Sequence, residues 1–471
     1  LENVCPNCGR TIKEETCPVC KGHTHHFERR PVNVNELLGS ACKKLGVDKP
    51  SPVKAVKGLM SETRTPESIE KGILRAKHEL TVFKDGTVRF DATNAPLTHF
   101  TPSEIGVSID KLRSFGYLYD QNGNQLQNSQ QICELKVQDV IIPAKCARYL
   151  VHVAQFLDEL LEKVYGLQSY YKVSRDEDLL GHLIIGLAPH TSSGVIGRII
   201  GFTEANVCYA HPLWHTAKRR DCDGDEDAVM LALDPLINFS KFYLPAQIGG
   251  MMDAPLLLNP IINPAEVGHE ALNVDVAKRY PLVFYESTLK STSPKLISKL
   301  IDTIGHRLGT SEQFQAMQYT HFTTDINAGN HESAYIKLGA MLNKMDGQLA
   351  LAEKIRAVDV KAVAKRVLTT HLIRDIAGNL KAFSTQSFRC KRCNLKYRRI
   401  PLQGRCSKCG GQLVLTVYRG GIEKYLNAAA NLAKKYGIED YYRQRIVIIE
   451  DELTLLFKAP KVKQVSLGEF M

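Results

Sequence analysis

The sequence predicts an α+β, multidomain protein, and three observations support this fold class. Short apolar runs separated by Gly and Pro fill residues 183–233 and are typical of strands. Longer stretches with apolar residues at helical spacing occupy residues 331–382 and 421–457. Paired cysteines near both ends predict two small metal-stabilised modules. The 471 residues are enough for roughly two to four domains with their own cores.

The composition is that of an ordinary globular protein with a basic surface. Hydrophobic residues make up 44% of the chain and charged residues 24%. The formal net charge of +11 favours a polyanionic partner such as nucleic acid. No apolar run approaches the roughly 20 residues that span a bilayer, so we expect no membrane contact and a cytoplasmic location. No signal peptide is visible, and the start at Leu1 predicts a fragment or a processed chain.

Residues 1–30 are predicted to form a small zinc module. Its four thiolates come from two Cys-x-x-Cys knuckles: Cys5, Cys8, Cys17 and Cys20. Four thiolates match a closed, tetrahedral structural zinc site. Three nearby histidines are alternative ligands or parts of a polar linker: His23, His25 and His26. Such paired cysteines also favour a reducing compartment over a disulfide framework.

Residues 31–130 are predicted to be a connecting region of helices and a hairpin. Residues 31–78 are predicted to be mostly helical and basic, with Lys and Arg on both sides of apolar positions. The stretch Val82–Phe90 places Asp85-Gly86 between apolar residues, which is the pattern of a hairpin turn.

Residues 131–330 are predicted to hold a compact barrel with an acidic loop at one rim. A short strand is expected at Val137–Pro143, and a core helix over Ala147–Tyr165. The strands of the barrel are expected at Leu183–Ala188, Val195–Phe202, Val207–Ala210 and Ala228–Leu233.

Beyond this region, residues 331–385 and 416–460 are predicted to be helical. Apolar stripes at Tyr335–Asn343 and Leu349–Thr370 have Lys and Arg on the opposite face. Residues 461–471 form a tail.

Residues 386–415 are predicted to form a second zinc module, a zinc ribbon. Its four ligands are Cys390, Cys393, Cys406 and Cys409. Its loop is unusually basic, with Lys396, Arg398, Arg399 and Arg405.

The most informative stretch is a run of acids directly before the apolar run Ala228–Leu233. Five carboxylates fall in the seven residues from 221 to 227. On an extended backbone alternate side chains share a face, which groups Asp221, Asp223, Asp225 and Asp227. Crowded carboxylates repel unless a cation neutralises them, and Mg²⁺ prefers carboxylate, water and phosphate oxygens. The pattern therefore predicts a metal-dependent phosphoryl-transfer site.

Two other interpretations of the acidic run, a solvated acidic turn and an EF-hand calcium loop, fit the sequence less well. A solvated acidic turn is disfavoured by the abrupt change to six apolar residues, which ties the acids to a core element. An EF-hand calcium loop requires Gly at its sixth position and Glu at its twelfth. Counted from Asp221, these positions hold Glu226 and Ala232, so the EF-hand is excluded.

Positive charge precedes the acids. Lys218, Arg219 and Arg220 are candidates to hold triphosphate or template phosphate, or to balance the charge of the acids. Three histidines are candidate substrate contacts or core residues: His190, His211 and His215.

The order of several motifs adds a family resemblance. The motifs are Gly186–Gly194, Gly197–Thr203, Tyr209–Pro212, the acidic run, Tyr243–Pro245 and Gly249–Pro255. Together they resemble the large, catalytic subunit of the archaeal D-family DNA polymerase, and the resemblance covers essentially the whole chain. It implies a double-psi β-barrel related to the catalytic barrels of multisubunit RNA polymerases.

The resemblance implies attack of a primer 3′ hydroxyl on a dNTP, assisted by two Mg²⁺ ions. It implies that Asp223 and Asp225 bind magnesium, with Asp227 and Asp221 as further catalytic candidates. The family usually has Asn at the position of Asp221. The extra carboxylate is expected to strengthen metal binding or to raise the pKa of a neighbouring acid. The predicted substrate- and DNA-binding residues are Lys218, Arg219, Arg220, His190 and Arg198.

The resemblance also implies partners. These are a DNA primer-template, a small subunit with a proofreading exonuclease that contacts residues 331–457, and the sliding clamp (PCNA). The tail resembles a clamp-binding box through Gln464, Leu467 and Phe470, with Met471 where a second aromatic residue is usual. A disordered tail is the alternative. The implied location is the nucleoid-associated cytoplasm of an archaeal cell.

The family has a second, N-terminal barrel that supplies basic residues to the same site and has no counterpart here. We therefore expect little polymerase activity from this chain alone. Two other functions remain open: an RNA-polymerase-like nucleotidyltransferase, and a non-catalytic zinc-ribbon scaffold that binds nucleic acid. Comparing the incorporation of ribonucleotides and deoxynucleotides distinguishes the RNA-polymerase-like enzyme from a DNA polymerase. Absence of metal binding at Asp223 and Asp225 would favour the non-catalytic scaffold.

Overall fold

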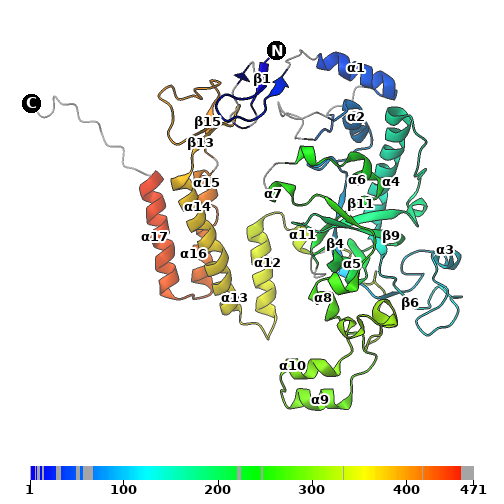
Figure 1. Ribbon diagram of the computed structural model, residues 1–471. Coiled ribbons are helices and arrows are strands. Elements are labelled where there is room, and N and C mark those ends of the chain that lie inside the picture. The colour runs from blue at the N-terminus through cyan, green and yellow to red at the C-terminus, as the bar shows by residue number, and fades with distance from the viewer. Residues whose placement is uncertain are drawn as a thin grey trace, which may run out of the picture. The chain divides into compact units, whose positions relative to one another are not determined.

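The chain divides into two compact units, residues 1–332 and 333–471, which are described separately. The computed structural model describes residues 2–5, 7, 11–12, 15–27, 33–48, 53–56, 67–219, 224–244, 248–332, 334–415 and 417–457. Figure 1 shows their helices and strands. The predicted clamp-binding residues, Gln464, Leu467 and Phe470, lie outside the described residues.

The first unit is built around a seven-stranded mixed sheet with the order β12-β9-β7-β10-β4-β11-β8. Its strands are β4 (Phe90–Pro96), β7 (Asp139–Pro143), β8 (Leu183–Leu187), β9 (Ser193–Thr203), β10 (Val207–Ala210), β11 (Glu226–Leu231) and β12 (Leu257–Asn259). Strand β9 also pairs with β8, antiparallel from Leu183↔Arg198 to Gly186↔Val195. The pairings of β8, β9, β7, β10, β4 and β11 therefore form a closed cycle, to which β12 adds.

The long helix α4 (Ala144–Glu159) covers this sheet and confirms the predicted core helix. It packs against β4, β7, β9 and β11, and Figure 1 shows it beside β11. Its apolar face, including Leu150, Phe156 and Leu157, is fully buried. A π-helical turn, η2 (Leu160–Tyr165), continues the helix until Gly166 adopts a left-handed conformation with φ of 68°.

The predicted hairpin at Val82–Phe90 is wrong, because residues 82–89 form no strand that could pair with β4. A tight loop takes its place, closed by the bond from Phe83 N–H to the Thr87 carbonyl (2.8 Å). Asp85 is fully buried in this loop and accepts hydrogen bonds from Thr87 and Arg89. Side-chain bonds to the backbone compete with the strand ladder and replace it here.

Short elements complete the first unit. Near the N-terminus, β1 (Glu2–Val4) pairs with β2 (Thr11–Ile12) and with β3 (His25–Phe27). Strands β5 (His99–Phe100) and β6 (Cys133–Glu134) form a small sheet. The helices are α1 (Val34–Leu45), α2 (Ile69–Lys77), α3 (Ile109–Ser114), η3 (Asp176–Leu179), α5 (Pro212–Ala217), α6 (Leu233–Asn238), η4 (Lys241–Tyr243) and α7 (Ile248–Met251). Further along are η5 (Pro264–Glu266), α8 (His269–Leu272), α9 (Leu282–Leu289), α10 (Pro294–Ile297), η6 (Ser298–Leu300), η7 (Ile304–Arg307) and η8 (Ser311–Phe314).

The second unit is mainly helical, as expected. Its helices are α11 (Ala334–Lys337), α12 (Met341–Lys354), α13 (Val360–Val367), η9 (Leu368–Leu372), α14 (Ile373–Thr385), α15 (Arg419–Glu423), α16 (Leu426–Lys435) and α17 (Asp440–Phe457). Between α14 and α15 a small sheet has the order β14-β13-β15, formed by β13 (Phe388–Cys390), β14 (Lys396–Tyr397) and β15 (Leu413–Val414).

Two predicted helices of this unit are interrupted. The stretch predicted at Leu349–Thr370 breaks after α12, because Asp359 caps a new helix by accepting a bond from Ala362 N–H (3.1 Å). The stretch predicted at Tyr335–Asn343 splits between α11 and α12. Within the described residues, no helix has both the length and the apolar character needed to cross a membrane.

Candidate active site

The acidic loop connects α5 to β11. Residues 220–223 are outside the described part of the chain, so the predicted roles of Arg220, Asp221 and Asp223 have no geometry to compare with. Gly224 has φ of 102°, in the region that favours glycine. Asp225 is half-buried and Glu226, which begins β11, is exposed.

Asn94, on β4, fixes the described end of this loop. Its backbone N–H donates to the Asp225 carbonyl (2.8 Å), and its Oδ1 accepts from Gly224 N–H (3.0 Å). Its Nδ2 donates to Asp227 Oδ2 (3.2 Å). Only 1% of Asn94 is exposed, so water does not compete for these bonds. A single buried residue therefore holds Gly224, Asp225 and Asp227 in place.

Lys218 and Asp227 form a buried ion pair behind the loop. Lys218 Nζ bonds Asp227 Oδ2 and lies 3.1 Å from His215 Nδ1. It also lies 4.0 Å from the centroid of the Trp214 ring. Lys218 and His215 are fully buried. The prediction that Lys218 binds phosphate is therefore not supported here, and the alternative of charge balance describes its geometry.

Burial and charge hold this network in one protonation state. Burial raises the pKa of Asp227, but the bonds from His215 and Lys218 outweigh it and keep that pKa below its usual value. Burial and the charge of Lys218 lower the pKa of His215 to about 4. Burial, together with His215, lowers the pKa of His211 to about 3. Both histidines are consequently neutral core residues near neutral pH.

Asp225 and Asp227 lie in different environments, although an extended backbone predicted that they share one face. Strand β11 starts only at Glu226, and the positive φ of Gly224 interrupts extended geometry before it. Asp227 is buried, and its Oδ1 has no hydrogen-bond partner among the described residues. Asp225 and Asp227 therefore differ in burial, and the shared face of their side chains stays a prediction.

The oxygen donors at this end of the loop fit the chemistry of magnesium. Asp225 offers a half-buried carboxylate, and Asp227 Oδ1 is a buried oxygen without a hydrogen bond in the described structure. Within the described residues, no three carboxylates lie close enough to hold an ion by themselves. Any magnesium site here thus needs further donors, and Asp221 and Asp223 are two acids earlier in the same loop.

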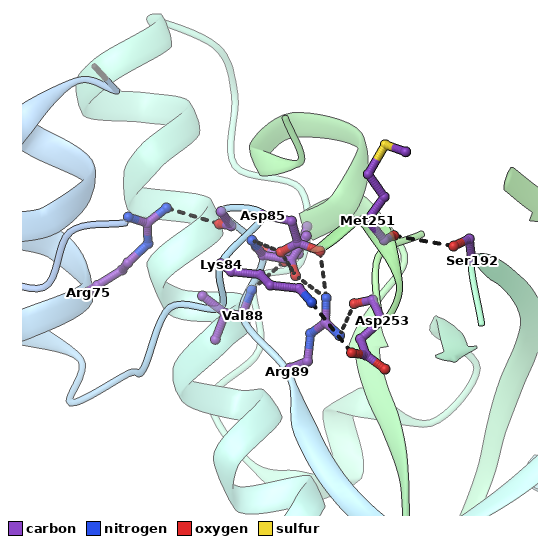
Figure 2. Close-up of polar contacts among 11 residues, drawn as sticks. Arg75, Lys84, Asp85, Val88, Arg89, Ser192, Met251 and Asp253 are labelled. Carbon is purple, nitrogen blue, oxygen red and sulfur yellow. Dashed lines mark hydrogen bonds and ion pairs between the residues drawn. The ribbon is translucent and has the colours of Figure 1, made fainter. Parts of the chain in front are cut away.

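Asp253 organises a second polar cluster, which Figure 2 shows. Its Oδ1 accepts from His190 N–H (2.6 Å), and its backbone carbonyl accepts from Arg89 Nη1 (2.9 Å). Lys84 Nζ lies 3.4 Å from its Oδ2. Burial alone would raise the pKa of Asp253. The hydrogen bond from His190 N–H and the charge of Lys84 have the larger effect and hold that pKa below its usual value. The cluster therefore ties the loop at His190 to the loop at Lys84.

A pocket of about 240 Å³ opens beside this cluster. It is lined by Phe83, Arg89, Asp91, Leu187, Ala188, Pro189, Glu226, Ala228 and Asp253. Arg89 lies over the ring of Phe83, 3.8 Å from its centroid. The pocket thus adjoins Glu226, the residue that follows Asp225. The side chain of His190 is exposed, and its contact with substrate stays a prediction.

Arg198 and Arg219, both predicted DNA contacts, have different environments. Arg198 makes a bidentate ion pair with Asp139, with both N···O distances at 2.8 Å, and stacks over Phe115. This pair joins β9 to β7 and uses the side chain that was predicted to contact DNA. Arg219 is exposed with φ of 66°, which leaves it accessible to phosphate.

Cysteines gather in both predicted zinc modules. The Sγ atoms of Cys390, Cys393, Cys406 and Cys409 all lie within 4.8 Å of one another. Cys5, Cys17 and Cys20 form a corresponding cluster, and the predicted fourth ligand, Cys8, lies outside the described residues. Thiolate sets of this kind suit zinc.

Sequence reasoning missed the two residues that brace the loops, Asn94 and Asp253. No local signal was available for Asn94, because its neighbours Ala92, Ala95 and Pro96 are themselves depleted in strands. Asp253 lies within a motif that carried the family resemblance, but nothing in the sequence connected it to Lys84 or Arg89.

Comparison with family models gives two matches. Residues 46–344 match the catalytic domain of the DNA polymerase II large subunit DP2, and residues 384–440 match the zinc finger domain of DNA polymerase-epsilon.

Curated relatives match over nearly the entire chain. The DNA polymerase II large subunit of Methanocella arvoryzae is 49% identical over 99% of this chain and 41% of its own length. The same subunit of Pyrococcus furiosus is 50% identical over 96% of this chain and 36% of its own length. The same subunit of Archaeoglobus fulgidus is 49% identical over 99% of this chain and 41% of its own length. The chain therefore spans about two fifths of the length of these relatives.

Proposed function

Because the chain belongs to the family of the DNA polymerase II large subunit, the archaeal D-family large subunit, we propose that it carries the catalytic core of a replicative DNA polymerase. The proposed reaction is attack of a primer 3′ hydroxyl on the α-phosphate of a dNTP, with release of pyrophosphate. The observation that carries the proposal is the acidic loop braced by Asn94, inside the segment that matches the catalytic domain.

We assign the roles in the site as follows. Asp223 and Asp225 hold two Mg²⁺ ions, which when bound stabilise the attacking and leaving oxygens. Asp221 is a further acidic candidate, and Arg219 and Arg220 hold phosphate. Asp227 acts as a positioning residue, because its carboxylate is buried against Lys218.

The strand pairings support a double-psi β-barrel for the core. Six strands pair in a closed cycle, and two of the pairings, β4 with β10 and β7 with β9, are parallel. Closure leaves the cycle without free edges and gives the acidic loop a rigid base at the start of β11.

The proposed cofactors and partners follow from the family and the modules. Zinc occupies both cysteine clusters, which are closed structural sites. The small exonuclease subunit contacts residues 331–457, and the tail with Gln464, Leu467 and Phe470 binds the sliding clamp. The boundaries of the seven segments proposed from the sequence stay predictions. The remaining part of a longer subunit supplies further basic residues to the site. The proposed location of the protein is the nucleoid-associated cytoplasm.

Primer extension tests the proposal. In the complete large subunit with its small subunit, Asp223→Asn or Asp225→Asn is expected to abolish extension while DNA affinity changes little. Glu226→Gln is the matched control, since it removes a neighbouring exposed acid and should retain extension. Extension by both Asn variants at the rate of the unchanged enzyme would contradict the proposal. Preference for ribonucleotides would favour the RNA-polymerase-like alternative.

A further inference from the structure

The net positive charge of the chain is concentrated in one segment of the second unit. Ten of the 61 Lys and Arg residues, and none of the 50 Asp and Glu residues, fall between residues 376 and 422. The remaining chain has 51 basic and 50 acidic residues and is nearly neutral. The basic character is therefore a local property of the module around the second cysteine cluster.

Six of these cations lie within eleven residues and form what we name the basic module surface: Arg389, Lys391, Arg392, Lys396, Arg398 and Arg399. All six are exposed. None makes an ion pair with an acid in the described part of the chain, although Arg389 bonds Asn394. Arg405 and Lys408, on the second knuckle, are also exposed.

The register of the small sheet places two of these cations side by side. Arg389 on β13 is directly opposite Lys396 on β14. Like charges at directly opposed positions destabilise a sheet. The cysteine cluster holds the strands in this arrangement, since Cys390 follows Arg389 and Cys393 lies before Lys396. The fold therefore maintains a repulsion that an anionic partner would relieve.

From this charge distribution we propose that the basic module surface, which belongs to the second unit, binds the phosphate backbone of DNA. Four of its six cations are Arg, whose planar guanidinium groups match phosphate oxygens with two donors. A polyphosphate chain extends along such a surface and contacts several cations at once, with release of counterions. This role concerns binding and does not depend on the chemistry proposed for Asp223 and Asp225.

Salt dependence of DNA affinity provides the test. The full chain is titrated with a fluorescent primer-template duplex between about 50 and 200 mM NaCl, alongside the variant Arg392→Gln/Arg398→Gln/Arg399→Gln. Since each lost phosphate contact lowers the slope of log Kd against log salt by about 0.9, the triple variant should have a slope lower by about 2–3. The control variant Lys290→Gln/Lys295→Gln/Lys299→Gln removes three exposed cations of the first unit and should keep the original slope.

Zinc content and the far-ultraviolet circular dichroism of each variant establish that the module is still folded. An unchanged slope in the folded Arg variant would overturn the proposal and favour an acidic protein as the partner. An equal loss in the Lys control would also overturn it, because the effect would then be one of general charge. If the complete large subunit with its small subunit failed in primer extension while the chain showed the predicted slopes, only the proposed function would be refuted.

Discussion

Asn94 is the residue on which the geometry of the acidic loop depends most directly. Asn94→Ala removes two side-chain bonds, one with the exposed Gly224 and one with the buried Asp227. The loss at the buried Asp227 costs about 1–3 kcal/mol. In the complete enzyme we expect extension to slow by about 10- to 100-fold, together with a higher Mg²⁺ requirement.

The Mg²⁺ dependence of the single-turnover rate measures this effect. Asn259→Ala is the control, because Asn259 bonds Ser193 at the edge strand β12 and has no contact with the loop. If Asn94→Ala only lowered stability, the Mg²⁺ requirement per folded molecule would stay the same, and the positioning role would be wrong.

Lys218 belongs to the same network, and its substitution is expected to lower the stability of the folded chain. Lys218→Met leaves the buried carboxylate of Asp227 without its charged partner, which costs about 3–5 kcal/mol. We expect urea unfolding of the chain to show this loss, and the double variant Lys218→Met/Asp227→Asn to recover part of it. A single variant as stable as the original would show that the ion pair does not form.

At the scale of elements, the loop of residues 83–89 depends on Gly86 and its packing against α6. Gly86 has φ of 95°, and a Cβ there would lie 2.4 Å from the carbonyl oxygen of Asn238. Gly123 has φ of 81° but open space around it. Gly86→Ala should therefore destabilise the chain by at least about 2 kcal/mol more than Gly123→Ala in urea unfolding. Equal losses would mean that the loop moves away from α6 freely.

Asp234 connects the same loop to α6 and predicts a pH dependence. It is fully buried and accepts bonds from Val88 N–H (2.7 Å) and Asn238 Nδ2 (2.8 Å). Burial raises its pKa to about 6, above its unfolded value of 3.8. Its contribution to stability is therefore full below pH 3.8 and is lost as the pH rises through 6.

We expect the unfolding free energy of the original chain to fall relative to Asp234→Asn by about 3 kcal/mol from pH 4 to pH 7. Urea titrations of both proteins at each pH measure this difference, in which other titrating groups cancel. A constant difference across this range would show that the carboxyl is ionised in the folded chain as in the unfolded one.

Element types were predictable where periodicity was strong, and failures have physical causes. The core helix α4 followed from its apolar stripe. The hairpin at Val82–Phe90 failed because a buried Asp85 bonds the backbone and prevents a ladder. The helix at Leu349–Thr370 failed because Asp359 caps a new helix. Local side-chain bonds of this kind compete with periodic patterns and are not visible in the pattern itself.

At the scale of the whole molecule, the sequence pointed to the site but not to its internal arrangement. The run of acids before an apolar strand located the loop, and the paired cysteines located both metal modules. The burial of Lys218 and Asp227, and the use of Arg198 by Asp139, depend on strands that are distant in the sequence. Asn94 is 130 residues from Gly224, so no local pattern could connect them.

Binding of Mn²⁺ to the zinc-loaded chain, followed by electron paramagnetic resonance, tests the central claim about the acidic loop most directly. We expect the chain to bind Mn²⁺, Glu226→Gln to retain this binding, and Asp223→Asn/Asp225→Asn to lose it. Equal Mn²⁺ binding by the chain and by Asp223→Asn/Asp225→Asn would contradict the claim that these aspartates hold the catalytic ions.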